Sequence, residues 1–102
     1  MKKQILKTST VVIAKDQVWC ELAGEAVILH FKSGVYYGLS PVGARVWSLI
    51  QEPKIVSAVL DMLLEEYEVE PDRCESDLFA LFQDLAIREL IEIQASANEA
   101  VR

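Results

Sequence analysis

The stretch Gly34–Trp47, GVYYGLSPVGARVW, passes from a strand pattern to a helix pattern at one point. Val35–Leu39 is rich in aromatic and branched residues, which favour the half-buried surface of a sheet. Ser40 offers an N-cap oxygen, and Pro41 fits the first helical turn because proline lacks only an N–H that would be unpaired there. The strand carries no Lys or Pro, so at the edge of a sheet it would be open to pairing with another chain.

Alternation along this strand divides its side chains between two faces. Val35, Tyr37 and Leu39 fall on one face, and Tyr36 and Gly38 fall on the other. We expect Tyr37 to lie partly in the core because it shares a face with Leu39, and Tyr36 to be a surface aromatic. Gly38 either permits close approach of another backbone or marks a bulge before the helix.

The sequence before Gly34 also reads as strands. Residues 10–14 and 18–22 flank Lys15-Asp16-Gln17, and residues 25–31 form a third run. Ala23-Gly24 has the form of a two-residue hairpin loop in which glycine supplies a positive φ.

Three helices are predicted after the strands. They cover residues 41–51, 56–67 and about 71–88, and Glu52-Pro53 ends the first. Residues 90–93 read as a short closing strand or wing, and residues 95–102 as a polar tail. This order predicts an α+β fold of the winged helix-turn-helix type: a small antiparallel three-stranded sheet with three helices, in a single domain over residues 1–102.

The third helix has a wider apolar surface than one small core requires. At about 100° per residue, an arc of roughly 160° holds Leu81, Cys74, Leu85, Leu78, Phe82, Ala86 and Phe79. Asp77, Asp84 and Arg88 line one flank of this arc. Either one face fills the core while the flank lines a groove, or the whole arc is buried. Pro71 as the first helical residue and a capping box of Asp72 with Glu75 are alternative starts.

Composition excludes several classes of protein. The chain has 102 residues, 52% of them hydrophobic, and a net charge of −6. Residues 1–51 carry a net +3 and residues 52–102 a net −9, so the second half repels phosphate backbones. Cys20 and Cys74 are read as buried cytosolic thiols without a disulfide or zinc motif. We expect no signal peptide, no membrane span and a cytoplasmic location.

No catalytic or cofactor motif is visible. His30 is the one histidine and has no Cys or His partner at ligand spacing. There is no Ser/His/Asp set, glycine-rich phosphate loop or metal motif. The sequence therefore predicts a protein that is not an enzyme and needs no cofactor or metal.

Several of these segments resemble the PqqD-like family. The likeness lies in Glu25–Val27, in Gly34–Leu39 and in Val42–Trp47, and more weakly in Glu65–Pro71 and Asp77–Leu85; it extends over residues 17–93. Members of this family are recognition domains for ribosomally made, post-translationally modified peptides. They bind the leader segment of a precursor and present its core to modifying enzymes.

The resemblance implies a site as well as a fold. In the family, the leader adds as an antiparallel strand to the third strand of the sheet and packs against the third helix. These correspond here to residues 35–39 and 72–88. The implied leader-binding residues are Val35, Tyr36, Tyr37, Gly38, Leu39, Cys74, Asp77, Leu78, Leu81, Asp84 and Leu85. Asp77 and Asp84 are expected to pair with basic residues of the leader.

The partner enzyme is left open between two settings of stand-alone members. One is lasso peptide biosynthesis, with a separate leader peptidase and a cyclase, which we favour; the other is pyrroloquinoline quinone biosynthesis, with a radical enzyme. A winged helix also suggests a DNA-binding regulator, but residues 74–89 carry a net charge of −3, which disfavours nucleic acid. A third alternative is a subunit of an enzyme whose chemistry lies on another chain.

Overall fold

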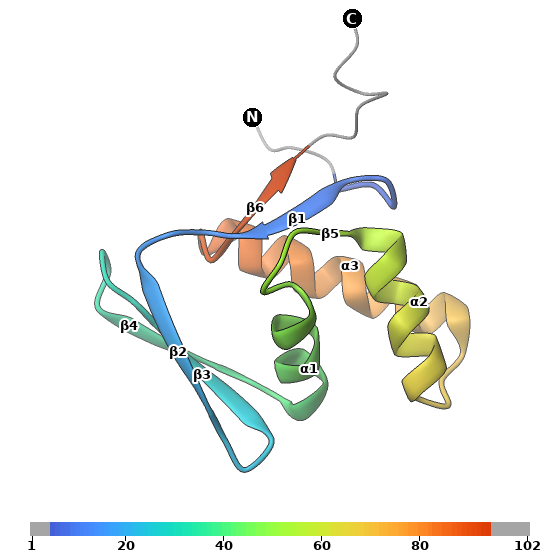
Figure 1. The fold of residues 1–102 in the computed structure, drawn as a ribbon, viewed down its shortest axis with the longest axis horizontal. Coiled ribbons are helices and arrows are strands. Elements are labelled where there is room, and N and C mark those ends of the chain that lie inside the picture. Colours follow the sequence, from blue (N-terminus) through green and yellow to red (C-terminus); the bar gives the residue numbers. More distant parts are fainter. Residues whose placement is uncertain (1–4, 95–102) are drawn as a thin grey trace, which may run out of the picture.

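The computed structural model describes residues 5–94, and in them the predicted α+β class is confirmed, with three helices and two small antiparallel sheets (Figure 1). The strands are β1 (Thr10–Ile13), β2 (Gln17–Leu22), β3 (Glu25–His30), β4 (Val35–Leu39), β5 (Lys54–Ile55) and β6 (Ile91–Gln94). The helices are α1 (Pro41–Leu49), α2 (Val56–Glu66) and α3 (Pro71–Ile87).

The first sheet has the strand order β2-β3-β4, so β4 lies at an edge. Ala23 and Gly24 both have positive φ, at 53° and 82°, as the tight hairpin turn between β2 and β3 requires. One face of the sheet packs on the helices, where Ala26 and Ile28 of β3 are fully buried. The alternation predicted for β4 is confirmed: Tyr37 packs against the core and Tyr36 is 68% exposed.

The second sheet, of order β5-β1-β6, corrects the expectation of one three-stranded sheet. β1 and β2 are neighbours in sequence but belong to different sheets, with Asp16 at φ 69° between them. β1 pairs instead with β6, from Thr10 with Gln94 to Ile13 with Ile91. Figure 1 shows this sheet above the helices and the β2-β3-β4 sheet to their left.

The core lies between the helices and the inner faces of the sheets. Its largest fully buried side chains include Trp47 of α1, Phe82 of α3 and Ile28 of β3, and Trp47 meets Trp19 edge to face with ring centroids 6.5 Å apart.

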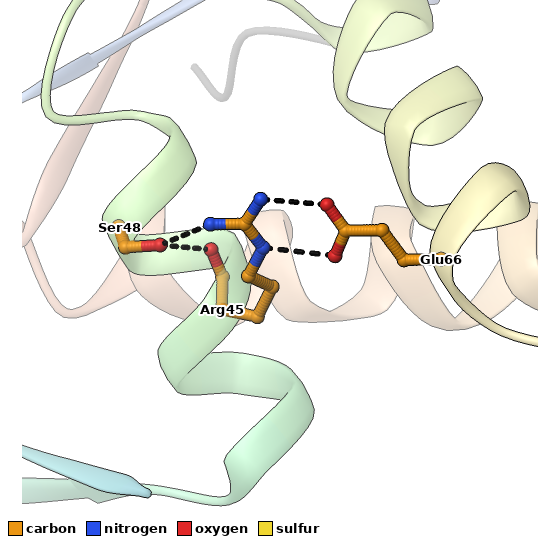
Figure 2. Close-up of polar contacts among 3 residues, drawn as sticks. All are labelled: Arg45, Ser48 and Glu66. Atoms are coloured by element: carbon orange, nitrogen blue, oxygen red, sulfur yellow. Dashed lines mark hydrogen bonds and ion pairs between the residues drawn. The ribbon is translucent and has the colours of Figure 1, made fainter.

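A two-pronged ion pair ties α1 to the end of α2 (Figure 2). Arg45 donates from Nε to Glu66 Oε1 at 2.8 Å and from Nη2 to Oε2 at 2.6 Å. Hydrogen bonding to Arg45 lowers the pKa of Glu66. These two hydrogen bonds link the C-terminal end of α2 to α1, just before the chain turns into α3.

The helix starts follow local chemistry. Ser40 caps α1, accepting a hydrogen bond from the Gly43 amide at 3.3 Å. Pro71 is the first residue of α3, whose N-cap Glu70 makes no side-chain cap bond. The alternative capping box of Asp72 and Glu75 is therefore wrong, because the helix already begins at the proline. No helix within residues 5–94 has the length and apolar character needed to cross a membrane.

The cysteines differ from the predicted buried pair. Cys20 is exposed and Cys74 only partly buried. Cys20 has this position because it alternates with Trp19, and Trp19 takes the inward face of β2.

Candidate functional site

The edge of β4 is one wall of the candidate site. β4 pairs with β3, from Ala26 with Leu39 to His30 with Val35, and no strand within residues 5–94 pairs along its other edge. An edge of this kind presents backbone N–H and C=O groups that an added strand can use. The predicted open edge is thus present.

The opposite wall is α3, and Arg88 joins the two walls at one end. The guanidinium carbon of Arg88 lies 5.1 Å from the centroid of the Tyr37 ring, within the range of a cation–π contact. Arg88 Nε also donates to Asp84 Oδ1 at 3.1 Å. Hydrogen bonding to Asp84 raises the pKa of Arg88, with smaller contributions from Tyr37. The guanidinium therefore bridges α3 and the edge strand.

A pocket of about 380 Å³ opens at the other end of β4, where the strand turns into α1. Its floor is apolar and includes Val46 of α1, Leu63 of α2 and Leu78 of α3, all at most 3% exposed. The remaining lining residues are Ser40, Val42, Gly43, Tyr67, Val69, Arg73, Cys74, Asp77 and Leu81. We call this the α3 pocket; its volume suits one or two apolar side chains of a ligand.

The thiol in the α3 pocket is not activated. Burial raises the pKa of Cys74, and the charge of Asp77 raises it further. A thiol with a raised pKa stays protonated at neutral pH and is a poor nucleophile. Cys74 therefore contributes an apolar contact surface to the pocket.

The acidic side chains of α3 already have basic partners. Asp77 lies 3.9 Å from Arg73 and Asp84 lies 3.1 Å from Arg88, each pair one helical turn apart. All four side chains are well exposed, so these pairs are worth little in free energy. A basic ligand residue at either carboxylate would compete with an arginine of the same helix.

The structure brings together part of the predicted site. The α3 pocket is lined by four predicted residues, Cys74, Asp77, Leu78 and Leu81. Leu39, the last residue of β4, directly precedes Ser40 at the rim of the pocket. Asp84 lies away from the α3 pocket, beside Arg88 at the C-terminal end of α3. Tyr36 and Gly38 point to the outer face of the sheet, away from α3, so they can meet a strand on this edge only through their backbone.

Leu85, which we expected at the groove, does not line the α3 pocket, and its contact with a leader stays a prediction. Leu85 is 2% exposed and packs in the core, because it shares one helical stripe with Leu78 and Phe82 at spacings of three and four residues. Leu78 reaches both the core and the pocket floor, whereas Leu81 is only partly buried. The structure thus places Leu81 at the α3 pocket and Leu85 in the core. That this flank of α3 binds a leader stays a prediction.

Sequence reasoning missed the contribution of the segment between α2 and α3. Tyr67 and Val69 line the pocket from this segment, and Arg73 lines it from the first turn of α3. Val69 is an aliphatic residue within a polar stretch of the sequence, and this was the signal that could have pointed to it. In the structure its side chain is 48% exposed.

In the described part of the chain, the groups to consider for catalysis or metal binding include His30 and the acidic side chains. His30 is 6% exposed, and its Nδ1 lies 3.1 Å from Ser33 Oγ. Residues 5–94 contain no group of three or more His, Cys, Asp or Glu side chains that could hold a metal ion.

Comparison with known proteins gives two matches of interest. The family model described as coenzyme PQQ synthesis protein D (PqqD) matches residues 25–91, more than half of the chain. Among solved structures, the chain is similar to that of "TbiB1 in Complex with the TbiA(beta) Leader Peptide". The TM-score is 0.75 at 37% identity, over 79% of this chain and 94% of that chain. None of the curated proteins matches.

Proposed function

Because the chain belongs to the PqqD family, we propose that it binds the leader segment of a ribosomally made precursor peptide by strand addition to β4. The membership confirms the family inferred from residues 17–93. The solved relative TbiB1 is a complex with a leader peptide, which supports a peptide ligand. The observation that carries the site is the open edge of β4 beside the α3 pocket.

Antiparallel addition to β4 would give the leader a defined direction. A strand antiparallel to β4 begins beside Leu39 and ends beside Val35. Its N-terminal part then lies at the α3 pocket and its C-terminal part passes Tyr37 and Arg88. In this proposal, backbone hydrogen bonds along β4 set the register, and apolar leader side chains in the pocket supply specificity.

The chain would serve as an adaptor in the cytoplasm without chemistry of its own. We propose that it presents the precursor core to a separate enzyme, and we favour the leader peptidase of a lasso peptide pathway. A PqqD-type peptide chaperone for a radical enzyme is the alternative. Reconstitution with each class of enzyme decides between them: the correct one processes its precursor faster when the chain is present.

We propose that the fold is a winged helix-turn-helix in which α2 and α3 are the paired helices and the closing strand β6 is the wing. DNA binding does not follow from it. α3 would be the recognition helix, yet residues 74–89 are acidic overall, and phosphate contacts need Lys or Arg. Duplex DNA is therefore a negative control in binding experiments.

Filling the α3 pocket tests the proposed site. We would titrate fluorescent TbiA(beta) leader peptide, and the cognate leader once known, into wild type, Cys74→Phe and Cys20→Phe. The first variant places a ring in the pocket; the second makes the same change on the far face of the sheet. We expect Cys74→Phe to weaken binding at least about tenfold, since it excludes one apolar side chain, and Cys20→Phe to bind normally. Equal binding by both variants would move the site away from this pocket.

A further inference from the structure

The outer face of the β2-β3-β4 sheet, which points away from the helices, is apolar. It consists of Val18, Cys20 and Leu22 of β2, Val27 and Leu29 of β3, and Tyr36 and Gly38 of β4. Antiparallel sheets with one solvated face normally place polar residues there. Glu25, at the hairpin end, is the one charged residue among the outward positions of these three strands.

These side chains stay accessible in the described part of the chain. Val18 is 51% exposed, Leu22 60% and Tyr36 68%, while Val27 and Leu29 are half-buried by their neighbours. Contiguous exposed apolar surface of this kind marks an interaction site more often than scattered single residues do.

We propose that a second copy of this chain covers the outer face, through a twofold stack of two β2-β3-β4 sheets. The axis runs between the sheets and perpendicular to the strands, which leaves the strands of the two copies antiparallel. Sheets packed in this way lie about 10 Å apart. The contact is isologous and closed, the commonest form of self-association.

Register makes the outer face complementary to itself. Val18, Leu29 and Tyr36 form one row across the sheet, and Cys20, Val27 and Gly38 form the adjacent row. When the axis passes between these rows, each row faces the other row of the second copy. The exposed ring of Tyr36 then stands over Gly38 of the second copy, where a Cβ would meet nothing within 4 Å. Because Gly38 has no side chain, the space above it is open to this ring.

Charge agrees with the same arrangement. Glu25 lies at the hairpin end of the sheet, and Lys32 lies beyond its opposite end. Reversal of strand direction brings Glu25 of one copy towards Lys32 of the other. The alternative stack with strands parallel would place like ends together and oppose the two Glu25 carboxylates.

The stack uses a face of the sheet and leaves both its edges free. β4 can therefore accept a leader strand in each copy, and dimer formation does not depend on the proposed function. The face is small beside the surface of a permanent dimer, so we expect association in the micromolar to millimolar range.

Sedimentation equilibrium across that range tests the proposal. The wild-type mass should rise from 11.5 kDa towards twice that value. Two variants should stay at the monomer mass. Val18→Lys would bury a charge in the stack, and Gly38→Leu would fill the open space above Gly38. Ile87→Lys is the matched control, because Ile87 is 62% exposed but lies on α3, and it should associate like wild type. Circular dichroism would confirm that each variant is folded.

Chemical cross-linking gives an independent readout. With Cys74 replaced by Ser, Cys20 is the remaining thiol, and a short bis-maleimide should join two Cys20 side chains across the stack. Adding Val18→Lys should abolish the cross-link. A wild-type chain that stays monomeric at all concentrations, or dimers of undiminished stability in Val18→Lys, would overturn the proposal. Binding of TbiA(beta) leader peptide by monomeric Val18→Lys reports on the proposed function separately.

Discussion

Arg88, the residue that ends α3, lies over the ring of Tyr37 in β4, with its guanidinium carbon 5.1 Å from the ring centroid. The two residues come from opposite walls of the cleft and are far apart in sequence. Arg88 is also held by Asp84 one turn earlier, so the guanidinium has a defined position. This contact joins α3 to β4 at the end where the leader would leave.

The Arg88–Tyr37 contact should appear as a coupling between the two positions. We predict that Tyr37→Leu and Arg88→Met together destabilise the protein less than the sum of the single changes, because either one alone already breaks the contact. The coupling should be small, since Arg88 is exposed. Urea unfolding of the four proteins measures it. Strict additivity would mean that the ring and the guanidinium are neighbours without an attractive interaction.

Leu81 and Leu85 provide a matched pair on one helix. Leu85→Ala removes a core side chain and should destabilise the fold by about 2–5 kcal/mol. Leu81→Ala trims a partly buried side chain at the pocket, so it should unfold at nearly the wild-type urea concentration. It should nevertheless weaken leader binding roughly tenfold. Urea unfolding and leader titration on both variants check this division. Full-affinity binding by a folded Leu81→Ala protein would place the leader elsewhere on α3.

The two thiols should differ in reactivity. Burial and the Asp77 charge raise the pKa of Cys74, so less of it is thiolate at pH 8 and alkylation is slower. Cys20 is exposed and should react first with iodoacetamide, as followed by mass spectrometry. The rate at Cys74 should keep rising with pH beyond the range in which an ordinary thiol becomes fully ionised. Bound leader should slow Cys74 further; unchanged Cys74 reactivity at saturating leader would argue against occupancy of the α3 pocket.

The sequence predicts the elements that depend on neighbouring residues, but not the pairing of strands that are far apart in the chain. The junction of β4 and α1 was read correctly because Ser40 and Pro41 act within one turn. The β5-β1-β6 sheet was missed because β1 pairs with Ile91–Gln94, and no local pattern records a partner so distant in sequence. The two-residue strand β5 is too short to leave a periodic pattern.

For the candidate site, the sequence predicted the two elements that form it, β4 and α3, but not which side chains of α3 line the pocket. Helical periodicity identified the apolar arc of α3, but it gives only directions around the helix axis. The line between core and groove depends on where β4 and α2 pack. That placement puts Leu85 in the core and brings Tyr67, Val69 and Arg73 to the pocket.

The most direct test of strand addition is amide hydrogen exchange with and without leader peptide, resolved by residue. The same sheet has two edges, and β2 is a built-in control because, within residues 5–94, it too pairs only with β3. If the leader adds to β4, alternate amides in Val35–Leu39 gain protection on binding while those of Gln17–Leu22 do not change. Protection of β2, or of neither edge at saturating leader, would contradict the account.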